Sequence, residues 1–193
     1  MSLEYALERY PLTVKLREDV ECVIRPLQKK DESRWHKFLL SAPEEEILYL
    51  KQPVTDRQVI HEWCLGLDYE ENLPLLMLHE SKVVGMATLH QRRGGWRRHI
   101  GLITIMTHPE YCGLNIGCIL TDELVEIARH LGLRKLEARL TGERTVTLDA
   151  LKKIGFRQLL YLPEYVLDMH CHPHDYVLMG LDLHTTEEFA GTG

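Results

Sequence analysis

Apolar and polar positions follow two different periods in the first third of the chain. Residues 20–27 alternate apolar and polar side chains, which is typical of a strand with one buried face. Apolar residues then recur at helical spacing in three blocks: one after a candidate N-cap at Asp31, one from Pro43, and one over 55–63. This pattern predicts one strand followed by a block of short helices.

Three strands in succession are predicted next. Residues 73–79 are apolar on both faces, 83–90 are rich in strand-forming residues, and 96–107 form a long third segment. A short turn at 80–82 separates the first two, and Gly94-Gly95 precedes the third. We expect an antiparallel meander.

The second half of the chain alternates between the two periods. An amphipathic helix follows Gly113 and ends before Gly132, and a second helix closes at Gly155. Strands are expected over three further segments: 134–140, 156–166 and 176–183, the last two as a hairpin. The order predicts an α/β fold with a mixed, mostly antiparallel central sheet flanked by helices on both faces.

One domain is expected over residues 20–183, after an N-terminal arm over 1–19 and before a disordered polar tail over 184–193. The start of the chain does not resemble a signal peptide, and no apolar run approaches the length of a membrane span. Its five cysteines lack a paired CxxC spacing, so we expect reduced thiols, a cytoplasmic location and no membrane association.

Charge argues against nucleic acid as the main partner, because the formal net charge is −6. Two local segments differ in composition from this acidic average of the chain. Four arginines surround the turn at 92–98, which suits either a solvated hairpin or a docking patch for an acidic partner. The run over 170–175 is rich in histidine, but its adjacent spacing is that of a polar loop, so no metal site is expected.

Candidate chemistry centres on the segment 108–117, where an apolar strand enters a tight glycine turn and a helix leaves it. The first turn of a helix has unpaired N–H donors at the positive end of its dipole. A phosphate can therefore be held there without a lysine.

This segment, the element order and the late pair Gly155-Phe156 resemble the GNAT superfamily of acyl-CoA-dependent N-acyltransferases. The family signature Q/R-x-x-G-x-G/A falls on residues 112–117. Gly117 matches, whereas Cys112 replaces the leading amide or basic residue and Asn115 replaces the middle glycine. Asparagine is the non-glycine residue that best tolerates a positive φ.

The resemblance implies a co-substrate, acetyl-CoA, and a place for it. Its pyrophosphate would lie on the backbone N–H groups of the turn, and its pantetheine arm would pair with the preceding strand where that strand splays from the next one. The residues so implicated are Cys112, Gly113, Leu114, Asn115, Ile116 and Gly117 in the turn, and Ile105, Met106 and Thr107 in the strand.

The implied reaction is direct attack of an amine on the thioester, with the amine carried by a small molecule or by a protein lysine. The base and acid candidates are His90, His99, His108, Tyr161 and Tyr165, and Tyr176 on the last strand is a further tyrosine considered for the acid. Positions at which many members carry a tyrosine and an asparagine hold Leu151 and Arg144. A non-catalytic acyl-CoA-binding regulatory module is the alternative, and a homodimer is a further expectation.

Overall fold

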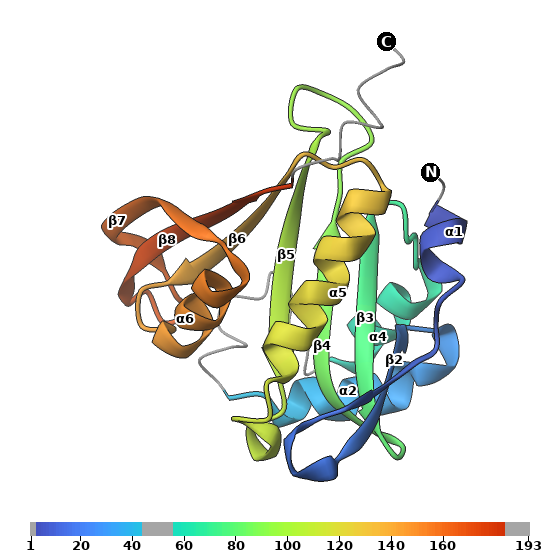
Figure 1. Ribbon diagram of the computed structural model, residues 1–193. Helices are drawn as coiled ribbons and strands as arrows, with labels where there is room; N and C mark the ends of the chain where they lie inside the picture. Colours follow the sequence, from blue (N-terminus) through green and yellow to red (C-terminus); the bar gives the residue numbers. More distant parts are fainter. Residues whose placement is uncertain (1–2, 44–55, 184–193) are drawn as a thin grey trace, which may run out of the picture.

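The computed structural model describes residues 3–43 and 56–183. Eight strands form one sheet in the order β1-β2-β3-β4-β5-β6-β8-β7 (Figure 1). Their bounds are β1 Leu12–Lys15, β2 Glu21–Pro26, β3 Asn72–His79, β4 Lys82–His90, β5 Ile100–Thr107, β6 Lys135–Thr141, β7 Arg157–Leu167 and β8 Pro173–Asp182. Among the strands of the described residues, β5 and β6 are the one parallel pair, so the predicted mixed, mostly antiparallel sheet is confirmed.

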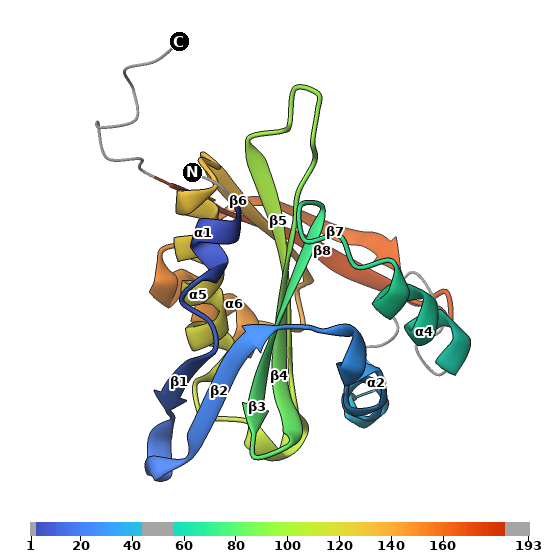
Figure 2. The same ribbon diagram turned by 90° about the vertical axis from the view of Figure 1, so that its right-hand side faces the viewer.

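Helices cover both faces of the sheet, as predicted (Figure 2). The α-helices are α1 Leu3–Leu7, α2 Glu32–Ser41, α4 Arg57–Leu65, α5 Ile116–His130 and α6 Thr145–Ile154, and short 3-10 turns are η1 Arg17–Asp19, η2 Lys29–Asp31 and η3 Pro109–Tyr111. Helices α1, α5 and α6 lie on one face, and α2 and α4 on the other. Strand alternation supplies both cores, because Ala87 packs in the α5 cluster while its neighbour Met86 packs in the α2 cluster.

Two segments of the described chain differ from the elements that the pattern predicted. Within residues 1–19 the structure contains α1 and an unpredicted edge strand, β1, which pairs antiparallel with β2. The long segment 96–107 becomes a strand only from Ile100, because residues 96–99 complete the turn that follows Gly95 at φ +83°. The helix predicted from Pro43 and the tail over 184–193 lie outside the described residues.

The sheet opens between its two parallel strands. Strand β6 pairs with β5 only from Ile100–Ile103 against Lys135–Ala138. Beyond Ile103, β5 stays paired with β4 up to Thr107, while β6 follows β8 up to Thr141. The two strands therefore diverge toward the start of α5 (Figure 1).

Candidate active site

The opening between β5 and β6 leads into a cavity of about 1170 Å³. Leu151 and Thr147 of α6 line it from one face of the sheet, and Trp35 and Trp63 of α2 and α4 line it from the other. One cavity thus reaches through the sheet, which suits a reaction between two substrates that arrive from opposite faces.

The turn before α5 has the backbone conformation that the sequence predicted. Asn115 is the N-cap of the helix at φ +66° and ψ +18°, and Gly113 lies at φ +86°. Asparagine adopts this left-handed region more readily than other non-glycine residues, so the replacement of a glycine at 115 preserves the turn. The Asn115 side chain makes no capping hydrogen bond to the helix.

Backbone N–H groups of this turn divide into two sets. Those of Cys112 and Leu114 donate to Pro109 and Tyr111 carbonyls, at 3.2 and 3.4 Å, and so stabilise the turn itself. Among the described residues, the structure gives no acceptor for the N–H groups of Gly113 and Asn115 or for the first three residues of α5. These donors can bind an anion at the positive end of the helix dipole.

A slot runs from this turn along the open edge of β5. The His108 N–H donates to the Val84 carbonyl of β4, and N–H groups alternate along a strand, so those of Thr107 and Ile105 point toward the opening. A Cβ added to Gly117 would lie 3.7 Å from the Ile105 side chain and 3.8 Å from that of Thr107. The missing side chain therefore keeps the slot free for an extended ligand.

On the α2–α4 side, the cavity has an aromatic wall and a polar end. The Trp35 and Trp63 rings lie 5.8 Å apart, and the Trp35 indole N–H contacts Met86 Sδ at 3.1 Å. His90, the last residue of β4, lies at the polar end between Asn72 and Thr104.

The hydrogen bonds of His90 determine its tautomer. Nδ1 lies 2.6 Å from Asn72 Oδ1, which can only accept, so Nδ1 carries the proton. Nε2 lies 3.1 Å from Thr104 Oγ1, and in this tautomer it can accept a hydrogen bond from the Thr104 hydroxyl. Thr104 follows the last β5 residue that pairs with β6. The His90 imidazole is thus held beside the opening of the sheet, between an amide oxygen and a hydroxyl group.

The other four of these candidates are not among the residues that line this cavity. His99 lies in the turn before β5, and His108 lines a separate cleft near α2. The Tyr161 hydroxyl donates to Asp175. Tyr165 is 66 % exposed, and its ring contacts the ring of Tyr176. Their catalytic roles stay predictions, and of the five only His90 is among the residues that line the cavity.

The cavity also contains residues that the sequence reasoning did not assign to a site. Asn72 and Thr104 have no motif around them, and only the register of β3, β4 and β5 brings them to His90. Tyr176 of β8, which the sequence did offer as a further tyrosine for the acid, lines the cavity too. Leu151 and Arg144, which stand where many family members have a tyrosine and an asparagine, are both part of the lining.

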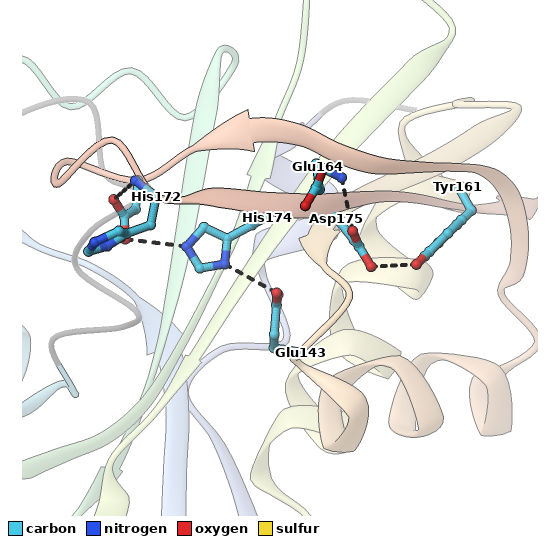
Figure 3. Close-up of polar contacts among 7 residues, drawn as sticks. Glu143, Tyr161, Glu164, His172, His174 and Asp175 are labelled. Atoms are coloured by element: carbon cyan, nitrogen blue, oxygen red, sulfur yellow. Dashed lines mark hydrogen bonds and ion pairs between the residues drawn. The ribbon is translucent and has the colours of Figure 1, made fainter.

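The histidine-rich segment forms a hydrogen-bonded loop between β7 and β8 (Figure 3). Asp168 accepts from the backbone N–H groups of His170 and His172. His174 bridges Asp168 and Glu143, at 3.3 and 3.2 Å, and these hydrogen bonds raise the pKa of its imidazole. Within the described ranges, no group of three or more potential ligands is arranged to hold a metal ion.

No helix in the described part of the chain is long and apolar enough to cross a membrane. The model of the acetyltransferase (GNAT) family matches residues 34–156, which contain the opening of the sheet, the turn and the start of α5.

Solved structures share this fold at low sequence identity. A ribosomal-protein-alanine N-acetyltransferase from Brucella melitensis has a TM-score of 0.73 at 21 % identity, over 83 % of this chain and 99 % of that one. The ribosomal-protein-S5-alanine acetyltransferase from Vibrio fischeri has a TM-score of 0.75 at 12 % identity, over 89 % and 97 %. A Salmonella typhimurium structure that contains acetyl-CoA has a TM-score of 0.71 at 17 % identity, over 86 % and 95 %.

These matches agree with the geometry, because the opened sheet and the unpaired N–H groups before α5 fit an extended ligand with a pyrophosphate. The family supports an acyltransferase enzyme, and no observation favours the regulatory module. The chain therefore belongs to the GNAT family of acetyltransferases, with acetyl-CoA as its co-substrate.

Proposed function

We propose that this enzyme transfers the acetyl group of acetyl-CoA directly to an amine bound on the α2–α4 side of the cavity, with His90 as the general base. The observation that carries the proposal is the hydrogen-bonded set Asn72–His90–Thr104 at the opening of the sheet. Asn72 fixes the tautomer, so the basic nitrogen of His90 faces Thr104 and the cavity.

The reaction needs one bond formed and one broken. The amine nitrogen attacks the thioester carbonyl carbon, the C–S bond breaks, and the proton released from nitrogen passes to His90 Nε2, either directly or through the Thr104 hydroxyl. Holding both substrates in one cavity supplies much of the rate through effective concentration. A β5 backbone N–H that faces the opening can stabilise the developing oxyanion.

The leaving thiolate also needs a proton, and Tyr176 is the tyrosine that lines the cavity. Its strand, β8, pairs with β6 beside the opening, where Tyr176 lies opposite Thr141. We assign Tyr176 as the acid. Leu151, which holds the corresponding position in the family pattern, has no proton to donate.

The acceptor is a primary amine on a small molecule or on a protein lysine. Its body would pack against Trp35, Trp63 and Met86, while the amine reaches His90. Three of the structural neighbours have names that specify ribosomal-protein alanine, so peptides that begin with alanine belong in the substrate panel.

The test is release of free CoA from acetyl-CoA, followed with a thiol reagent across a panel of small amines, lysine peptides and alanine-starting peptides. We expect His90→Gln to lower kcat by about 10²–10⁴-fold with acetyl-CoA affinity unchanged. It should also remove the acid limb of the pH–rate profile. His99→Gln, a histidine outside the cavity, is the matched control. A His90→Gln enzyme with the wild-type rate and pH profile would exclude His90 as the base.

The Tyr176→Phe variant tests the proposed acid independently of the proposed base, His90. It should lower the rate with acetyl-CoA and have less effect with a thioester whose leaving thiol is more acidic, because that thiolate needs less protonation. An equal loss with both thioesters would show that Tyr176 acts through packing.

A further inference from the structure

A second cleft, about 600 Å³ in volume, lies between α2 and the β3–β4 turn. Cationic side chains dominate its lining: Lys30, Arg34, Lys37 and Lys82. Glu80 is the one acidic residue among the residues that the structure gives as its lining. Such a concentration of positive charge contrasts with the formal net charge of −6 of the whole chain.

Much of this positive charge is not neutralised by the protein. Within the described ranges, Lys30 and Lys37 have no ion-pair partner. Arg34 lies 3.3 Å from Asp31, but Asp31 already accepts two hydrogen bonds from Arg25, at 2.6 and 2.8 Å.

The remaining cation is paired at the edge of the cleft. Lys82 lies 2.6 Å from Glu110, and both side chains are exposed to solvent. Exposed pairs of this kind contribute little binding energy and can exchange for a stronger anion. The cleft therefore retains a net positive charge.

A neutral hydrogen-bond donor completes the lining. His108 has a side chain that is only 8 % exposed, and its Nδ1 accepts from the Glu110 N–H at 3.3 Å. The proton therefore sits on Nε2, for which the described residues offer no acceptor, and His108 is among the residues that line the cleft. Burial, and then the charge of Lys82, lower the pKa of the His108 imidazole.

We propose that this cleft binds the dianion of a phosphomonoester. Two unpaired lysines and an arginine match two negative charges better than the single charge of a carboxylate, and a phosphate oxygen can accept from the His108 Nε2–H. The phosphate can come from the 3′-phosphate of CoA or from a separate ligand. His108 directly precedes the turn that leads to α5, so the two sites are neighbours along the chain.

The test keeps the turn before α5 occupied while phosphate is titrated. Protein saturated with dephospho-CoA, which lacks the 3′-phosphate, is titrated with inorganic phosphate by calorimetry, and the ¹⁵N shift of His108 Nε2 is followed by NMR. We expect saturable binding that moves this resonance. The Lys30→Gln/Lys37→Gln variant should bind phosphate about tenfold or more weakly.

Lys15→Gln/Lys29→Gln is the matched control, because it removes the same charge from exposed lysines that do not line the cleft. Equal weakening in both double variants, or no shift of His108, would overturn the proposal. Repeating the titration with CoA identifies the source: loss of phosphate binding assigns the cleft to the 3′-phosphate of CoA, and persistence assigns it to a separate phosphate ligand.

Discussion

Replacing Gly117 by alanine should make the protein more stable while it weakens acetyl-CoA binding. Gly117 is the second residue of α5, and an added Cβ would lie 3.7 and 3.8 Å from the side chains of Ile105 and Thr107. These are ordinary van der Waals distances, so the fold accepts the methyl group. The same methyl group, however, enters the slot beside β5.

The two effects have different sizes and opposite signs. Alanine in a helix is more stable than glycine by about 0.5–1 kcal/mol, which raises the Tm by about 1–4 °C for a chain of this size. Pushing the pyrophosphate off one backbone donor costs about 1.5–3 kcal/mol, because hydrogen bonds to charged groups are strong. That loss corresponds to about 10- to 150-fold in Kd.

Calorimetric titration with acetyl-CoA and a thermal melt of the same sample measure both quantities. Cys118→Ala is the matched control, since it changes the next helical residue and leaves every backbone donor in place. A Gly117→Ala protein with the wild-type Kd would refute the placement of acetyl-CoA along β5. A strong fall in the Tm of Gly117→Ala would show that the added methyl group clashes with its neighbours, and would refute the conclusion that the slot beside Gly117 is open.

Three further predictions concern stability. Asn115→Gly should keep acetyl-CoA binding, because glycine adopts φ +66° without steric strain. The free energy of unfolding, measured with urea, should rise by less than about 1 kcal/mol. Leu151→Ala should lower the free energy of unfolding by about 2–5 kcal/mol, since Leu151 is 1 % exposed. Burial acts to raise the pKa of Asp31, but hydrogen bonds from Arg25 and the Gln28 N–H outweigh it, so the pKa is lowered. Its charge therefore stabilises the fold above the unfolded pKa, about 3.9, and this contribution disappears as the pH falls through the folded value. Urea titrations at pH 7 and pH 3 should show a smaller acid loss in Asp31→Asn than in the wild type.

Periodicity identified most of the fold because each buried face leaves its period in the chain. The amphipathic stripe of α5 and the two-faced apolar strand β3 were both predicted from their patterns. Strand β1 was not predicted, because its four residues alternate only between half-buried and exposed positions. A short edge strand buries too little surface to leave a clear pattern.

The turn before α5 could also be predicted, since its chemistry is local. Gly113 and Asn115 are residues that accept a positive φ, and a helix that begins there presents N–H donors wherever it lies in the fold. Which of these donors remain available depends on the turn, because the Cys112 and Leu114 N–H groups are used within it.

The sequence by itself thus determined the order of elements, the two faces of the sheet and a helix start that presents N–H donors, since each depends on residues close together in the chain. Tertiary structure alone decided which histidine faces the cavity. His90 meets Asn72 and Thr104 through pairing across three strands, and the basic cleft gathers side chains from α2, the β3–β4 turn and the end of β5. Contacts between residues so distant in sequence depend on strand register and helix packing, which no local pattern specifies.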